Sequence, residues 1–258
     1  MAAILPRTGS ADTLRPQFER TGYVVCPGLF DPAEMREIIA WIDEIQSWPE
    51  TPGRHWMYFE KSKTVPSRRL LSRIENFVPF HAGLRDLVQS ERMLGTASRL
   101  LGGPAVLFKD KVNFKLPGGG GFEPHQDVQA GWDEYAKIFL TAMVSIDDTT
   151  IENGCLELAE WPHRREMIGQ LWKPLTEQET VGISYRPLPT VPGDAVFFDS
   201  FLPHRSEPNP TASARRVLYI TYNLLAEGDQ RERYYADKHR SYPQDCEREP
   251  GKVYEYKV

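Results

Sequence analysis

The amino-acid sequence predicts a mainly β protein, an antiparallel barrel or jelly roll behind a helical N-terminal layer. Apolar residues at helical spacing dominate the first hundred residues, whereas short β-branched and aromatic segments, punctuated by Gly and Pro, follow Pro104. Between these segments we expect no helix except a short one at residues 164–171. A doubly wound α/β sheet needs longer crossover helices, so this fold class is excluded.

Two helical stretches are predicted before Pro104. The first begins at Asp31, because the run Asp31-Pro32-Ala33-Glu34 offers a capping side chain, a proline suited to the first turn and a glutamate at the capping-box position. The apolar residues that follow recur at helical spacing and are expected to face the core: Met35, Ile38, Ile39, Ile42 and Ile45. The second stretch covers residues 84–101 and ends at Gly102-Gly103-Pro104.

The β-core is predicted over about residues 104–225. Its expected strands are 105–115, 138–146, 155–158, 182–188, 195–198 and 217–223. We interpret residues 1–258 as a single domain, with the helical layer over about 1–103 and a charged, Tyr-rich tail over 226–258 that wraps the surface.

Charge and composition exclude several classes of function. The chain has 31 Lys and Arg against 36 Asp and Glu, a net charge of −5, whereas binders of nucleic acid or anionic membranes normally carry a basic surplus. Its three scattered cysteines suggest no disulfide framework. The N-terminus lacks a signal-peptide pattern, and no apolar run approaches the roughly 20 residues of a membrane span. We expect a cytoplasmic protein with a small-molecule partner, and the oligomeric state stays open.

Two histidine motifs in the β-core predict a metal site. On an extended strand His125 and Asp127 point the same way, and His204 follows an apolar strand further along the chain. Two histidines and one carboxylate leave three metal positions open, which is the facial triad of non-haem Fe(II) oxygenases. Structural zinc prefers four protein ligands, often cysteines. Arg215 begins a buried strand and needs an anionic partner, which a dicarboxylate co-substrate supplies.

Taken together, these motifs resemble the phytanoyl-CoA dioxygenase family over most of the chain, from about Gly22 onward. The matching residues are Lys115-Leu116-Pro117-Gly118, His125-Gln126-Asp127, Glu152-Asn153-Gly154-Cys155-Leu156, Pro192-Gly193-Asp194, His204-x-Ser206 and Arg215. The resemblance implies a double-stranded β-helix and an oxygenase that uses Fe(II), 2-oxoglutarate and O₂. It implies His125, Asp127 and His204 as iron ligands. It also implies that Arg215 binds the distal carboxylate of 2-oxoglutarate with Ser206 beside it, while Arg216 faces the opposite side of the strand.

The strand at 105–115 indicates the character of the pocket. One face carries Lys109, Lys111, Asn113 and Lys115, and this face is either solvated or a cationic wall. In the resembling family the strand borders the 2-oxoglutarate site, so Lys111 is expected to contact the co-substrate or the substrate. Asn113, Gln129 and Trp132 are the candidate substrate contacts. A cationic wall favours a small anionic or zwitterionic substrate over a long acyl chain.

Within the family, the runs at 203–209 and 234–238 are similar to those of bacterial and fungal members. Some of these members, such as the 2-aminoethylphosphonate dioxygenases, hydroxylate small phosphonates. Two departures concern the pocket: many relatives have a Trp near Met143, and many have Pro-Gly-Ser-His where this chain has Glu160-Trp161-Pro162-His163.

Three alternatives to a small-molecule hydroxylase remain at this point. One is a jelly-roll protein that binds metal as a sensor or without turnover. The second is a zinc hydrolase on a similar barrel, which gives no reason for Arg215 or for Ser206. The third is an oxygenase of a hydrophobic natural product.

Overall fold

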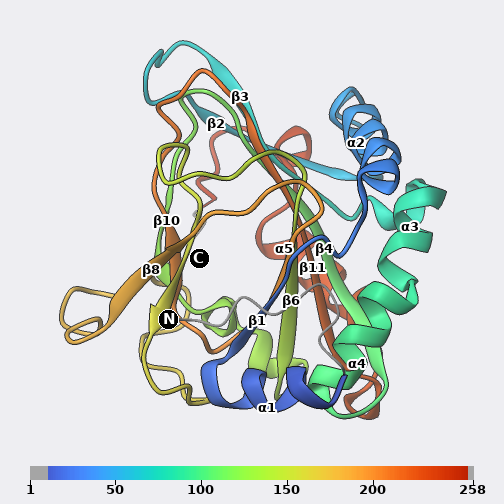
Figure 1. The fold of residues 1–258 in the computed structure, drawn as a ribbon. Coiled ribbons are helices and arrows are strands. Elements are labelled where there is room, and N and C mark those ends of the chain that lie inside the picture. Colours follow the sequence, from blue (N-terminus) through green and yellow to red (C-terminus); the bar gives the residue numbers. More distant parts are fainter. Residues whose placement is uncertain (1–10, 255–258) are drawn as a thin grey trace.

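Two antiparallel sheets face each other in the computed structural model, which describes residues 11–254 (Figure 1). The larger sheet has seven strands in the order β1-β9-β6-β11-β4-β3-β2, and the smaller has four in the order β5-β10-β7-β8. The strands are β1 (Tyr23–Cys26), β2 (Trp56–Lys61), β3 (Arg69–Glu75), β4 (Ala105–Lys115), β5 (Phe122–His125), β6 (Phe139–Ser145), β7 (Leu156–Glu160), β8 (Ser184–Leu188), β9 (Ala195–Asp199), β10 (His204–Ser206) and β11 (Arg215–Leu224). The predicted mainly β jelly roll, a double-stranded β-helix, is confirmed.

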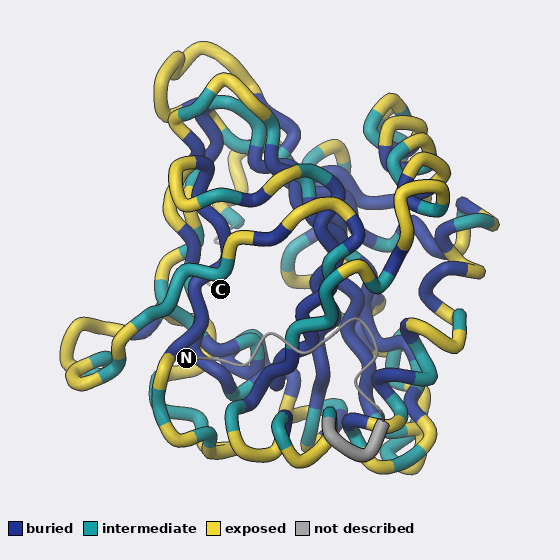
Figure 2. Tube along the Cα trace, viewed as in Figure 1, coloured by how far each residue is buried: buried dark blue, intermediate teal, exposed yellow. Residues whose placement is uncertain are grey.

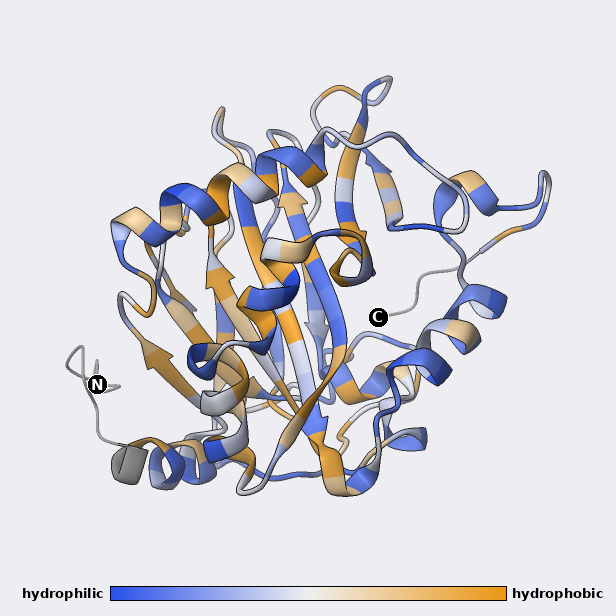
Figure 3. Ribbon diagram, turned by 90° about the vertical axis from the view of Figure 1, so that its right-hand side faces the viewer, coloured by the Kyte–Doolittle hydropathy of each residue, from blue (hydrophilic) through white to orange (hydrophobic). Residues whose placement is uncertain are grey.

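Helices cover the outer face of the larger sheet. The α-helices of the described chain are α1 (Ala11–Thr21), α2 (Pro32–Gln46), α3 (Ala82–Gln89), α4 (Thr96–Leu101) and α5 (Arg231–Ser241). Side chains of α1 to α4 share one apolar core with β4, β6, β9 and β11, and the hydropathy colours show this layer (Figure 3). Among residues 11–254 no helix is both long and apolar enough to cross a membrane.

The helix predicted at Asp31 begins there. Asp31 Oδ1 accepts hydrogen bonds from Ala33 N at 2.7 Å and Glu34 N at 3.0 Å, and Asp31 N donates to Glu34 Oε2 at 2.9 Å. This reciprocal capping box satisfies amide groups that the first helical turn leaves free. The apolar stripe of α2 is buried at Met35, Ile38, Ile42 and Ile45.

The N-terminal hundred residues contain more β-structure than predicted, since β1, β2 and β3 all lie in the expected helical layer. The periodicity failed because β3 carries charges on its inner face, at Arg73 and Glu75, so no alternation of apolar and polar residues marks it. The stretch at 84–101 also divides, into α3, a π-helical turn at Glu91–Gly95 and α4. Ser90 ends α3 and caps the turn through Met93 N.

The short helix expected at 164–171 is absent, and the segment has no regular structure. Its backbone bonds to side chains instead of to itself: Gln126 Nε2 donates to Glu166 O, and Ile168 N donates to Gln126 Oε1. The segment continues into an exposed loop before β8 (Figure 2). We call residues 161–175 the strap, because they lie across the turn that follows β5.

The C-terminal segment forms α5 and packs against the larger sheet. Tyr234 and Tyr235 are buried with Trp56 and Phe108 in an aromatic cluster. Asp110 on β4 anchors this helix through hydrogen bonds with the Tyr235 hydroxyl and an ion pair with Arg231. As a result, side chains of α5 reach the interior beside β3 and β4.

Candidate active site

Three side chains with metal-ligating atoms converge where β5 meets β10. His125 ends β5, Asp127 begins the turn behind it, and His204 begins β10 directly opposite His125 in the strand register. Their ligand atoms all lie within 4.8 Å of one another. The two imidazole rings have centroids 4.2 Å apart, and His204 Nε2 lies 3.9 Å from Asp127 Oδ1. The fold thus brings together the three residues that the sequence singled out.

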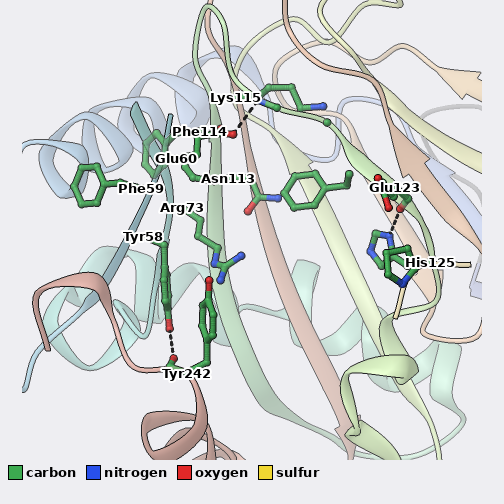
Figure 4. Close-up of a pocket in the computed structure, with 15 residues that line it drawn as sticks. Tyr58, Phe59, Glu60, Arg73, Asn113, Phe114, Lys115, Glu123, His125 and Tyr242 are labelled. Atoms are coloured by element: carbon green, nitrogen blue, oxygen red, sulfur yellow. Dashed lines mark hydrogen bonds between the residues drawn. The ribbon is translucent and has the colours of Figure 1, made fainter. Parts of the chain in front are cut away.

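Backbone carbonyls fix the orientation of both imidazoles. His125 Nδ1 lies 2.7 Å from Glu123 O (Figure 4), and His204 Nδ1 lies 3.0 Å from Leu202 O. A carbonyl only accepts, so each Nδ1 donates and each Nε2 keeps a lone pair for a metal. Burial also lowers the pKa of both imidazoles, that of His125 to about 3, with His204 contributing.

Asp127 completes this donor set as a carboxylate. Burial alone would raise the pKa of Asp127. The neighbouring His204 and Lys111 outweigh this effect, so the pKa of the carboxyl is lowered overall. Its Oδ2 accepts a hydrogen bond of 3.0 Å from Thr141 Oγ1, which leaves Oδ1 on the side of His204. Two neutral imidazoles and an ionised carboxylate are the protonation states that bind a divalent metal. Thr141 is a supporting residue that the sequence analysis missed, and its place on the apolar strand β6 gave no signal.

Arg215 is a fully buried cation at the start of β11, with an exposed fraction of 1%. Its guanidinium bonds to Tyr219, but it forms no ion pair within residues 11–254, and its Nε has no hydrogen-bond partner there. A buried guanidinium without a counter-ion is costly, so the site favours an anionic ligand. The forked donors match a carboxylate.

Lys115 and Ser206 lie beside this guanidinium. Lys115 pairs with Arg215 across β4 and β11, and its Nζ donates to Ser206 Oγ at 2.8 Å. Burial and the charge of Arg215 lower the pKa of Lys115 to about 6. A carboxylate bound between Lys115 and Arg215 would offset both the cost of burial and the repulsion between the two side chains. From the sequence, Lys115 is expected in the cationic wall and in the motif Lys115-Leu116-Pro117-Gly118, but not as a neighbour of the Arg215 guanidinium.

Arg216 points to the opposite side of β11, as expected from the alternation of strand residues. Its Nε and Nη2 donate to the two oxygens of Asp147, both at 2.9 Å, and Nη1 reaches Asp43 on α2. Arg216 therefore has acidic partners within the fold, whereas Arg215 has none among residues 11–254.

Two cavities flank the three convergent side chains. The smaller, about 380 Å³, is lined by His125 together with Asn113, Arg73, Tyr58 and Tyr242 (Figure 4). The larger, about 670 Å³, is lined by Asp127 and by residues from β4, from the turn after β5 and from α5. These include Lys109, Trp132, Tyr234 and Lys238.

The cationic face of β4 turns inward, so the solvated alternative is wrong. Lys109, Asn113 and Lys115 are buried and Lys111 is half-buried. Lys111 Nζ lies 4.9 Å from the centroid of the Tyr219 ring. Burial and Lys109 lower the pKa of Lys111 to about 8, against the opposing charge of Asp127.

The three candidate substrate contacts differ in whether their polar side-chain atoms are free to bind a ligand. Asn113 lines the smaller cavity and its Oδ1 has no hydrogen-bond partner among the described residues. Trp132 lines the larger cavity, and its Nε1 is likewise unpartnered within residues 11–254. Gln129 is different. Its Nε2 donates to Gln170 O and Lys173 O, and its Oε1 accepts from the neighbouring backbone, so the amide holds the strap and is not a substrate contact.

A buried charge cluster that the sequence did not predict lies next to the larger cavity. Glu75 on β3 is 1% exposed, and its carboxylate lies 3.0 Å from Arg73 Nε and 3.5 Å from Lys109 Nζ. Lys238 on α5 donates a hydrogen bond to Glu75 Oε2. Burial would raise the pKa of Glu75, but these three cations lower it, so the carboxylate is ionised. No sequence pattern links the three contributing segments.

The structure is a jelly roll with two histidines and one carboxylate around an open centre. It also contains a buried arginine that can bind an anionic ligand. This combination is typical of the non-haem Fe(II) oxygenases. The family model described as phytanoyl-CoA dioxygenase (PhyH) matches residues 18–217, and the chain belongs to this family. It is a 2-oxoglutarate-dependent oxygenase that uses Fe(II) and O₂.

Characterised relatives align over nearly the whole chain. The 2-aminoethylphosphonate dioxygenase of the uncultured bacterium HF130_AEPn_1 is 40% identical over 93% of this chain and 92% of its own length. The methylphosphonate hydroxylase of Gimesia maris is 39% identical over 92% and 90%. Among solved structures, EctD from S. alaskensis with 2-oxoglutarate and 5-hydroxyectoine has the same fold, with a TM-score of 0.70 at 20% identity over 86% of this chain and 78% of its own.

Proposed function

We propose that this enzyme hydroxylates a small phosphonate, an alkylphosphonate or an aminoalkylphosphonate. The observation that carries the proposal is the inward-facing cationic side of β4 beside Asp127. Lys109 is buried between Glu75 and the Trp132 ring, and half-buried Lys111 lies over the Tyr219 ring. The names of the two relatives at about 40% identity support it.

In this proposal His125, Asp127 and His204 hold the iron. The donor set fits Fe(II), because each imidazole presents an unprotonated Nε2 and the carboxylate presents Oδ1. When bound, iron and 2-oxoglutarate activate O₂ and supply the oxidation of a substrate C–H bond. The protein holds these ligands in position and keeps the imidazoles neutral.

Arg215 binds the distal carboxylate of 2-oxoglutarate, with Lys115 and Ser206 beside it. The support is the buried guanidinium without a counter-ion and the ammonium group that it borders. Lys111 lies between this region and Asp127, since it pairs with Tyr219, which interacts with both Arg215 and Asp127. We assign Lys111 to the substrate side, because Lys115 already serves the co-substrate.

The substrate lies in the larger cavity, against Lys109 and Trp132. Asn113 lines the smaller cavity instead, and we propose that its unpartnered Oδ1 accepts from a ligand donor that enters there. An apolar natural product would offer the buried ammonium groups of Lys109 and Lys238 no acceptor beyond the Glu75 carboxylate that they already share. Apolar contact does not recover that desolvation cost, so the hydrophobic alternative is disfavoured.

The test is substrate-dependent release of succinate from 2-oxoglutarate by the Fe(II)-loaded enzyme. The panel contains 2-aminoethylphosphonate, methylphosphonate, the carboxylate β-alanine and an apolar terpenoid. We expect strong stimulation by at least one phosphonate and none by the terpenoid. Efficient turnover of the terpenoid, with no response to either phosphonate, would overturn the proposal.

A further inference from the structure

Lys109 and Lys238 reach the larger cavity from two separate elements. Lys109 comes from β4 and Lys238 from α5, and both line the same cavity of about 670 Å³ as Asp127. A molecule in this cavity can therefore approach Asp127 and both lysine side chains, which all line its wall.

Both ammonium groups are held in place by one carboxylate and by aromatic rings. Glu75 receives Lys109 at 3.5 Å and a hydrogen bond from Lys238. Lys109 Nζ lies 5.6 Å from the centroids of both the Trp132 and the Tyr234 ring. Lys238 Nζ lies 5.4 Å from the Tyr58 centroid. The positions of the two charges are fixed before a ligand arrives, which lowers the entropic cost of binding.

The charges at this place do not cancel. Glu75 is a single carboxylate, whereas three basic side chains contact it: Lys109, Lys238 and Arg73. The other acidic groups that line the cavity are engaged or exposed. Asp237 accepts from Tyr135 and pairs with Arg240, and Glu134 lies at the exposed rim. Burial lowers the pKa of Lys238, a cost that a second anion next to it would offset.

We propose that Lys109 and Lys238, held by Glu75, form the anchor for the phosphonate group and make the enzyme prefer a phosphonate over the carboxylate of the same chain length. This inference rests on the proposed function. A phosphonate has three acceptor oxygens and more than one negative charge near neutral pH, whereas a carboxylate has two oxygens and one charge. Each ammonium has three N–H donors, and its contact with Glu75 leaves donors free for a ligand.

The experiment measures binding of 2-aminoethylphosphonate and β-alanine to the complex of enzyme, Fe(II) and 2-oxoglutarate without O₂, by calorimetry. The variants are Lys109→Met and Lys238→Met. Each should weaken phosphonate binding by roughly tenfold to a hundredfold, the effect of losing a charge-assisted hydrogen bond. The preference for the phosphonate over β-alanine should fall in parallel.

Lys252→Met is the matched control. Lys252 lines the same cavity, but its side chain is 51% exposed and it pairs with Glu249 at the surface. This variant should bind the phosphonate within twofold of the wild type. The affinity for 2-oxoglutarate is measured in all three variants. An unchanged value shows that the site is folded, whereas a general loss of structure would lower it.

The outcomes separate the two proposals. If the wild type binds and turns over no phosphonate, the proposed function itself fails. If the wild type binds and turns over a phosphonate but both Lys109→Met and Lys238→Met keep wild-type phosphonate affinity, the proposed anchor is wrong and the proposed function stands. If both variants lose affinity for phosphonate and β-alanine equally, the two lysines contribute general charge, and the selectivity claim is wrong.

Discussion

Two adjacent arginines on β11 face opposite sides of the sheet and differ in their partners. Arg215 faces the interior without an acidic partner, whereas Arg216 faces outward and pairs with Asp147 and Asp43. Strand alternation and the motif were enough to predict this difference from the sequence.

We predict that Arg215→Gln raises the KM for 2-oxoglutarate by at least a hundredfold, consistent with the roughly 3–5 kcal/mol of a broken buried charge pair. Arg216→Gln should leave this KM within about threefold, because its contacts lie on the far side of the sheet. Instead it should lower the free energy of unfolding by roughly 1–3 kcal/mol. Steady-state kinetics and urea unfolding check both. A larger KM effect from Arg216 would show that the roles are reversed.

We predict that His125→Ala and His204→Ala each lose tight Fe(II) binding and remain folded. Both side chains face an open centre, and their bonds to the fold are single contacts with backbone carbonyls. Metal content after dialysis and the circular dichroism spectrum are the measurements, with exposed His239→Ala as the control. Stoichiometric iron in either variant would remove that residue from the ligand set.

At the scale of elements, the sequence predicted correctly those helices and strands that local patterns mark. The capping box placed α2, and the alternation along β4 placed its four polar residues on one face. The charge cluster was not predictable, since Glu75, Lys109 and Lys238 come from β3, β4 and α5 and meet only through tertiary packing. Gln129 was assigned to the substrate because its position after Asp127 was known, whereas its partners in the strap were not.

The strap offers a test of how an irregular element is held. We predict that Gln129→Leu lowers the free energy of unfolding by roughly 1–3 kcal/mol, because it removes three buried hydrogen bonds. It should also speed cleavage by a protease within residues 161–183. The control is Gln170→Leu, whose side chain bonds only to exposed Lys173. Equal protease sensitivity of the wild type and Gln129→Leu would show that other contacts hold the strap.

Asp110 is one of two buried carboxylates that hold α5 in the described chain, the other being Glu75. Asp110 Oδ2 accepts from Phe77 N at 2.7 Å and Val78 N at 3.0 Å, and Oδ1 pairs with Arg231. We predict that Asp110→Ala lowers the free energy of unfolding by roughly 3–5 kcal/mol, because it leaves a mostly buried arginine without its partner. Denaturant unfolding measures this, with exposed Asp86→Ala expected within about 0.5 kcal/mol of the wild type. A loss below about 1 kcal/mol for Asp110→Ala would contradict the account.

At the scale of the whole molecule, the jelly roll brings together segments that are distant in the chain. Pairing of β5 with β10 sets His125 opposite His204, and pairing of β4 with β11 sets Lys115 opposite Arg215. The chain carries a net charge of −5, yet its interior site gathers cations. Overall charge therefore says nothing about the charge of the substrate, which depends on local burial.

The most direct test of the central claim, that the enzyme hydroxylates a small phosphonate, is product analysis with isotopically labelled O₂. The Fe(II)-loaded enzyme is incubated with 2-oxoglutarate and either 2-aminoethylphosphonate or methylphosphonate, and succinate and phosphonate products are quantified by mass spectrometry. The account predicts, for at least one of them, a product heavier by one labelled oxygen, formed in equal amount to succinate. Succinate formed without any change in either phosphonate, or no succinate at all, would contradict it.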